Sequence, residues 1–165
     1  TKFEIDHNID KTNIHDVFSV KYPNNNRNQD PVWDENFYNS LLQSFVGIVT
    51  ETRFAQACAN YSEKVLQPMQ YMKPFILLAP PHTLKYIKES GYQTFSDFWD
   101  ESYDSTEDHG ERLRKILELI KSLLDKPIEE LRNVYQQMLP VLEHNRKLHK
   151  ELTQTPNYKY TEFHN

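Results

Sequence analysis

The chain has 165 residues, which is enough for one domain with a hydrophobic core and too few for two domains of ordinary size. Apolar residues make up 38% and charged residues 26% of the chain, which is typical of a folded protein with a polar surface. The formal net charge is −5 and the basic residues form no stripe, so duplex nucleic acid is not expected to be the main partner.

Residues 1–43 are predicted to be a polar lead-in or linker. The stretch 22–31 is rich in asparagine and proline, and we interpret it as a solvated linker, with a binding loop as the alternative. Residues 34–43 are predicted to form a short helix.

No membrane span or signal peptide is expected. No run of about 18 apolar residues occurs, and the first residues lack the basic and apolar regions of a signal peptide as well as a starting methionine. The single cysteine, Cys58, excludes an internal disulfide. We therefore expect a cytoplasmic protein, or a virion-associated one if it is viral, that is a processed product or a fragment.

Residues 44–95 have the pattern of a β-α-β-α-β unit. The short apolar runs 44–50 and 75–79 are typical of strands buried on both faces of a parallel sheet, and a third short strand is predicted over residues 92–95. Strands that alternate with helices favour parallel pairing. The predicted fold class is therefore α/β, with a Rossmann-like parallel sheet.

Two helices connect these strands. Ser62 can cap a first helix that begins at Glu63, in which Pro68 is expected to kink the helix or mark the start of its regular part. Lys73 and Pro74 are predicted to end it. The second helix is predicted over residues 83–89 and is closed by Gly91.

The C-terminal region is predicted to be helical. Residues 110–124 place one apolar stripe on a helix, and Pro127 is predicted to open a second helix that bends at Pro140. The stripe of the first helix consists of Leu113, Ile116, Leu117, Ile120, Leu123 and Leu124. The predicted domain therefore covers residues 44–152, and residues 153–165 are a polar tail.

The first candidate site residues are Glu51 and Thr52, which follow the first predicted strand. In open parallel sheets, ligands bind beyond the carboxyl ends of the strands, where a carboxylate can accept hydrogen bonds from ribose or sugar hydroxyls. The alternative is a carboxylate that caps a helix or forms an ion pair.

The second candidate is the triplet Ser62, Glu63 and Lys64 at a predicted helix start. Helix N-termini bind phosphate through free N–H groups and a partial positive charge. Lys64 would add a full charge, and Glu63 would lie near the sugar or ribose. An ordinary helix start with a serine cap is the alternative.

The third candidate consists of His82 and Thr83 in the proline-rich loop after the second strand. Either side chain could face the same crevice. A rigid turn in which Thr83 caps the next helix is at least as good an interpretation.

The acidic segment 99–104 could bind a metal or act in acid–base chemistry, but we favour a structured loop anchored by its aromatic residues. Seven histidines are scattered, and the five-residue spacing of His144 and His149 does not suit a helical metal pair, so no metal site is predicted. The three glycines form neither a standard dinucleotide fingerprint nor a P-loop.

Three motifs in order resemble the C-terminal half of GT-B glycosyltransferases, and in particular α-1,3-fucosyltransferases. They are Ile48-Val49-Thr50-Glu51-Thr52, Tyr61-Ser62-Glu63-Lys64 and Pro74-Phe75-Ile76-Leu77-Leu78. The later stretch through Gly91, Phe95 and residues 99–104 resembles uncharacterised glycosyltransferase-like proteins of phages and marine microbes. The resemblance covers roughly residues 40–150.

The resemblance implies a donor-binding half of a GT-B fold that takes a UDP- or GDP-sugar. Glu51 would contact the ribose or sugar, and Glu63 and Lys64 would flank the diphosphate. Enzymes of this kind generally need no metal, so no cofactor is expected besides the nucleotide-sugar donor. Thr50 and Thr52 stand where the family has phenylalanine and asparagine, which leaves the donor open.

A GT-B enzyme also has an N-terminal domain that supplies the acceptor site and the usual catalytic base. The chain is too short to contain it, so a missing domain or a partner chain is expected and no catalytic residue is assigned. The alternative is a non-enzymatic structural or interaction protein, such as a virion component, that retains the fold. A different nucleotide-binding α/β enzyme is a weaker interpretation.

Overall fold

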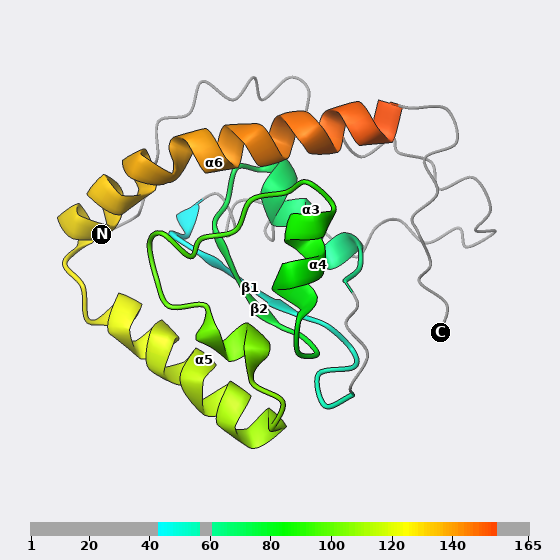
Figure 1. Ribbon diagram of the computed structural model, residues 1–165. Coiled ribbons are helices and arrows are strands. Elements are labelled where there is room, and N and C mark those ends of the chain that lie inside the picture. Colours follow the sequence, from blue (N-terminus) through cyan, green and yellow to red (C-terminus); the bar gives the residue numbers. More distant parts are fainter. Residues whose placement is uncertain (1–42, 57–60, 155–165) are drawn as a thin grey trace, which may run out of the picture.

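The computed structural model describes residues 43–56 and 61–154 (Figure 1). Over these residues the chain is mixed α/β. Its elements are strand β1 (Gly47–Thr50), helix α3 (Glu63–Gln70), strand β2 (Phe75–Leu78), helix α4 (Thr83–Glu89), the 3-10 turn η2 (Ser102–Ser105), helix α5 (His109–Leu124) and helix α6 (Ile128–Gln154).

Several predictions fall outside the described residues. These are the lead-in 1–42 with most of the helix predicted over 34–43, the residue Cys58, and the tail from residue 155 onward. Within the described part of the chain, none of the helices is long and apolar enough to cross a membrane.

Strands β1 and β2 pair in parallel, with Gly47 opposite Phe75 and Thr50 opposite Leu78. Both lie within the predicted strands, so the two strands are confirmed. The predicted burial on both faces is wrong for β1, in which Ile48 and Thr50 are exposed. Strand β2 consists of four apolar residues, three of which are at most 2% exposed. Burial of this run on both faces of the sheet is the main reason that the strand forms.

Helix α3 connects β1 to β2 and begins where the sequence predicts. The Ser62 side chain accepts a hydrogen bond from the N–H of Lys64, which caps the helix. Pro68 lies inside the helix, which ends two residues later at Gln70. Met72 then adopts a left-handed backbone, with φ of 54°, and the chain turns back into β2. The buried side of α3 consists of Val65, Leu66, Pro68 and Met69.

Helix α4 has the predicted bounds of residues 83–89. Gly91 follows with φ of +91°, a conformation that favours glycine and explains why the helix closes there. The residue before the helix, His82, is also left-handed, with φ of 64°. A non-glycine residue in this conformation is uncommon, so the turn into α4 is held by contacts from elsewhere in the chain.

The prediction of a third strand over residues 92–95 is wrong, because the sheet of the described residues has two strands. The N–H of Gln93 donates to the side-chain oxygen of Asn145, and the amide nitrogen of Asn145 donates to the carbonyl of Gln93, both over 2.8 Å. The N–H of Phe95 donates to the carboxylate of Glu101 over 2.8 Å. Side chains therefore form the hydrogen bonds with these backbone groups that a neighbouring strand would otherwise form. The observed unit is β-α-β-α, and a complete Rossmann-like half is not established.

Helix α5 forms as predicted and begins one residue earlier, with Asp108 as its cap. Its predicted stripe is only partly buried: Ile116 and Leu123 are buried, and the same side also carries Arg112 and Leu119. The buried face is therefore rotated from the predicted stripe toward Arg112 and Leu119. The side chains left exposed are Leu113 (37%), Leu117 (55%) and Leu124 (79%).

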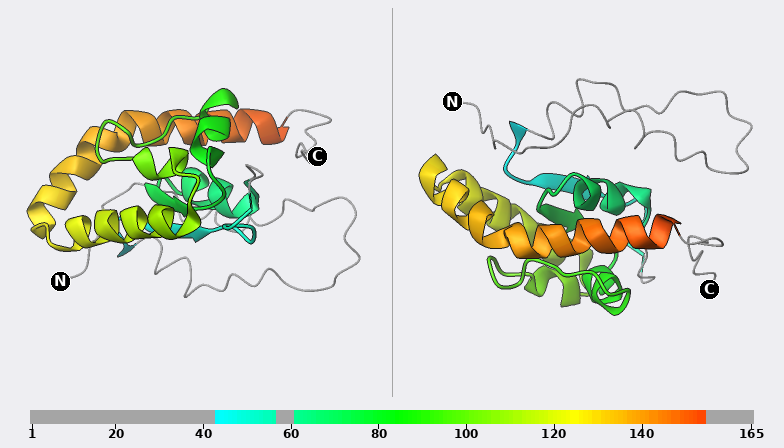
Figure 2. Two further views of the ribbon diagram at one scale, coloured as in Figure 1. Left: turned by 60° about the horizontal axis from the view of Figure 1, so that its bottom comes forward. Right: turned by 90° about the horizontal axis from the view of Figure 1, so that it is seen from above.

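Helix α6 starts at Ile128, directly after Pro127, and continues through Pro140. Tyr135, Met138 and Leu142 are buried on its inner face, where they form part of the hydrophobic core. Figure 1 shows α5 and α6 joined at one end and diverging, with the sheet between them, and Figure 2 shows the curved course of α6. Helix α6 packs against α3, and α5 packs against β2. The carboxyl edge of the sheet lies at the loops after β1 and β2.

Candidate functional site at the start of helix α3

Glu51 lies at the carboxyl edge of the sheet, as predicted from its place after the first strand. Its N–H donates to the carbonyl of Leu78 over 2.8 Å, which extends the β1–β2 ladder by one residue. Its carboxylate accepts a 2.8 Å hydrogen bond from the N–H of Ser62, and the Ser62 hydroxyl lies 2.9 Å from both carboxylate oxygens. Only 8% of the Glu51 side chain is exposed. The strand and the helix start therefore hold this carboxylate in one position.

Lys64 brings a positive charge to the same place. Its Nζ donates to the Ser62 hydroxyl over 3.2 Å and lies 3.9 Å from a carboxylate oxygen of Glu51 and 3.5 Å from one of Glu63. The side chains of Lys64 and Glu63 are 35% and 47% exposed. The structure thus brings Glu51, Ser62, Glu63 and Lys64 together, although the chain separates Glu51 from the triplet by ten residues.

The arrangement explains how a carboxylate can be held with little exposure. The N-terminus of α3 carries partial positive charge, and the ammonium of Lys64 adds to it, so both favour an anion at this point. The anion that occupies the point is the Glu51 carboxylate itself. A ligand phosphate at this helix must therefore lie beside Glu51, toward Lys64, or take its place.

Thr52 and the loop after β2 have different surroundings. Thr52 is exposed in the turn after Glu51. Thr83 is fully buried, and its hydroxyl donates to the carbonyl of Pro80 over 2.8 Å. His82 is partly exposed, and its Nε2 lies 2.9 Å from a carboxylate oxygen of Glu107. His82 is thus the side chain of this loop that a ligand could reach most easily.

The acidic segment 99–104 is a structured loop, as favoured from the sequence. The carboxylate of Asp104 accepts from the N–H groups of Leu84 (2.8 Å) and Lys85 (3.2 Å) and so caps helix α4. Burial raises the pKa of Asp104, although these hydrogen bonds act in the opposite direction. Its backbone carbonyl also accepts from the N–H of His82 over 2.6 Å, which holds the left-handed turn before α4.

Glu101 and Asp100 have contrasting roles in the same loop. Glu101 accepts from the hydroxyl of Thr94 and lies 3.6 Å from the ammonium of Lys88, and burial raises its pKa. Asp100 accepts from the N–H and hydroxyl of Ser102, and these bonds lower its pKa. Across the described residues, no group of three or more histidine, cysteine, aspartate or glutamate side chains is arranged to hold a metal.

Sequence reasoning missed Arg112, which shapes the loop that follows Glu51. It is 1% exposed and donates to the backbone carbonyls of Phe54 (2.5 Å) and Thr106 (2.6 Å). Its guanidinium also lies 4.5 Å from the centre of the Phe54 ring. Burial lowers the pKa of Arg112. The available signal was its spacing of four residues before Ile116, which places it on the buried face of α5.

Sequence reasoning also missed Lys73, which holds the entry to β1. This lysine is fully buried, and its Nζ donates to the carbonyl of Ser44 over 2.7 Å. It lies 5.7 Å from the centre of the Tyr135 ring. Burial lowers the pKa of Lys73 to about 8. The contact joins the turn before β2 to the residues before β1 and to α6.

No protein-family model, no curated protein and no solved structure matches the chain. The geometry of the described residues is therefore the basis for any functional assignment. The resemblance to GT-B glycosyltransferases remains a hypothesis that rests on the three motifs.

Proposed function

We propose that the chain is a nucleotide-sugar-binding domain that serves a metal-independent glycosyltransferase. The observation that carries the proposal is the meeting of Glu51, Ser62 and Lys64 at the start of α3. Two of the three motifs of the resemblance contribute to this cluster, at the edge of a parallel sheet where ligands bind in α/β proteins. The third motif supplies strand β2, which positions that edge.

In this proposal the residues of the cluster bind the sugar or ribose and the diphosphate of the donor. The fixed carboxylate of Glu51 can accept a hydrogen bond from a ribose or sugar hydroxyl in place of the one from Ser62. The partly exposed ammonium of Lys64 is the group that can neutralise a diphosphate, and the α3 N-terminus adds partial positive charge. His82 and Thr52 flank the edge on the loops after β2 and β1. In this proposal the acceptor site and the catalytic base belong to another domain or to a partner chain.

Isothermal titration with a panel of UDP- and GDP-sugars tests the proposal. At least one is expected to bind, and Lys64→Met should weaken it at least tenfold, a change of about 1.4 kcal/mol in binding free energy. Lys121→Met removes the same charge from an exposed position on α5 and is expected to bind as the wild type does. Absence of binding to the whole panel would refute the proposal, as would equal affinities of the two variants.

A second candidate function is a non-enzymatic interaction protein, favoured by the exposed leucines of α5 and by Ile48 of β1, which is 52% exposed. Exposed apolar side chains that lie near one another mark contacts with other proteins. This function predicts a bound partner in pull-downs and its loss in a Leu117→Lys, Leu124→Lys variant. A monomer in light scattering with no partner would count against it.

A further inference from the structure

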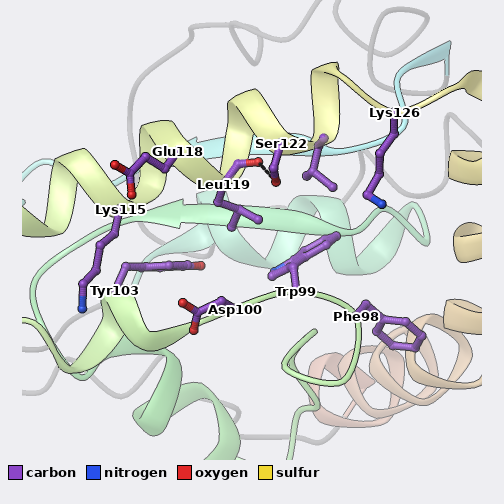
Figure 3. A pocket seen from close by; sticks show the side chains of 10 residues that line it. Phe98, Trp99, Asp100, Tyr103, Lys115, Glu118, Leu119, Ser122 and Lys126 are labelled. Atoms are coloured by element: carbon purple, nitrogen blue, oxygen red, sulfur yellow. Dashed lines mark hydrogen bonds between the residues drawn. The ribbon is translucent and has the colours of Figure 1, made fainter.

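A pocket of about 320 Å³ lies between helix α5 and the segment 98–103, apart from the Glu51 cluster (Figure 3). Its volume is at the lower end of the range for sites that bind small molecules. Phe98, Leu119 and Leu123 give it an apolar wall. The charged residues that line it are Asp100, Lys115, Glu118 and Lys126.

Trp99 is the reason to expect a ligand here. It is 7% exposed, and its buried indole N–H donates to no acceptor among the described residues. Figure 3 shows the nitrogen edge of the ring turned toward the side of the pocket where Asp100 and Tyr103 lie. A buried donor without an acceptor is unfavourable, so a ligand atom that reaches it gains a hydrogen bond at no loss to the protein. Because the nitrogen is covered, the ring or a neighbouring side chain must shift slightly for the acceptor to reach it.

The two carboxylates that line the pocket already accept from protein donors. The two carboxylate oxygens of Asp100 accept from the N–H and the hydroxyl of Ser102, each over 2.8 Å. The carboxylate of Glu118 is paired with Arg114. Both carboxylates are therefore hydrogen-bonded or ion-paired within the protein, whereas the indole N–H of Trp99 has no acceptor among the described residues.

The two lysines that line the pocket have N–H donors left for a ligand. Lys115 donates to the hydroxyl of Thr106 over 3.0 Å, and Lys126 is paired with Glu130. Each ammonium has three N–H donors, so each can donate to a further partner. In the view of Figure 3, Lys115 and Lys126 lie at opposite ends of the pocket, with Trp99 between them.

We propose that this pocket binds a small carboxylate with an apolar body, such as an aromatic acid. The carboxylate accepts from the indole N–H of Trp99 and from the ammonium of Lys115 or Lys126, and the apolar body lies against Phe98, Leu119 and Leu123. This site is separate from the nucleotide-sugar site and does not depend on it.

Benzoate is the probe, and the indole N–H signal of Trp99 in ¹⁵N NMR is the readout. The chain has two tryptophans, so Trp33→Phe assigns the signal. Benzoate is expected to shift it in a saturable way, with a dissociation constant of about 1 mM or below. Benzyl alcohol has the same ring without the charge and is expected to bind at least tenfold more weakly. No saturable shift up to about 20 mM benzoate, or equal binding of benzyl alcohol, overturns the proposal.

Variants distinguish benzoate binding in the pocket from an unspecific effect of benzoate on the Trp99 signal. Lys115→Met and Lys126→Met change partly exposed residues, and one of them should weaken benzoate binding at least tenfold. Trp99→Phe keeps an aromatic ring but removes the indole N–H, and it should also weaken benzoate binding. Because the indole signal is then absent, fluorine NMR of 4-fluorobenzoate measures binding to this variant. Wild-type affinity in both lysine variants overturns the proposal, even where Trp99→Phe fails to fold.

Discussion

The N-termini of helices α3 and α4 each bind a carboxylate from a distant part of the chain, but in different ways. At α3, Glu51 accepts from Ser62 and has the ammonium of Lys64 at 3.9 Å. At α4, Asp104 accepts from the N–H groups of Leu84 and Lys85, and burial raises its pKa. One helix start combines a fixed carboxylate with a partly exposed cation, whereas the other is a desolvated cap.

The difference between the two helix starts distinguishes a candidate binding site at α3 from a structural cap at α4. A carboxylate at a helix N-terminus is favourable in both places because of the helix dipole. At α3 the lysine of the first turn lies 3.9 Å from the carboxylate. At α4 the exposed lysine of the first turn, Lys85, is paired with Glu89 instead. The comparison therefore predicts that changes at α3 affect ligand binding and stability, while changes at α4 affect stability alone.

The largest expected effect on stability is that of Glu51→Ala. It removes charge-assisted hydrogen bonds to Ser62 at the end of the sheet, and the free energy of unfolding should fall by about 2 kcal/mol. Urea denaturation measures it. The matched control is Glu63→Ala, which removes a half-exposed carboxylate from the same helix start and should change stability by no more than about 0.5 kcal/mol. Equal effects of the two variants would contradict the role given to Glu51.

Asp104→Ala should have a smaller effect, about 1 kcal/mol. Two hydrogen bonds to α4 are lost, but the partial desolvation of the carboxylate is relieved at the same time. The exposed Asp97→Ala is the control, with no expected change. If Asp104→Ala also weakened nucleotide-sugar binding as much as Lys64→Met, the distinction between the two helix starts would be lost.

The smallest expected effect is on the pH dependence of stability, to which Asp104 and Asp100 contribute with opposite signs. The folded pKa of Asp104 is raised, so its contribution is fully present below the unfolded pKa of about 3.9 and falls as pH rises through the folded value. The stability of the wild type relative to Asp104→Asn should therefore decrease as pH rises from 3 to 7. Asp100→Asn should show the reverse, since hydrogen bonds lower the pKa of Asp100. Denaturation at a series of pH values measures both, and equal slopes would be inconsistent with them.

Local signals in the sequence predicted most of the elements. The bounds of α4 follow from a proline-rich loop before it and Gly91 after it, and α5 follows from its apolar spacing. The start of α3 follows from the Ser62 cap. These features are decided within a few residues of one another, so composition and spacing reveal them.

Contacts between distant residues were harder to predict. The order of the motifs indicated that Glu51 and Ser62 belong to one edge, but not that the carboxylate would accept hydrogen bonds from the Ser62 cap. Arg112 was missed because an arginine inside an apolar helix pattern is usually placed on the solvent side. Its partners are backbone carbonyls, which leave no mark in the sequence.

The amide of Asn145 has a consequence for the order in which the chain can fold. It takes both backbone groups of Gln93 across a separation of 52 residues, and only a side chain with a donor and an acceptor at this spacing can do so. During synthesis, residues 92–95 emerge long before the helix that holds them. This segment can reach its final arrangement only after most of α6 has left the ribosome, so a chain that stops short of Asn145 is expected to keep α4 but leave the segment after it without its partner.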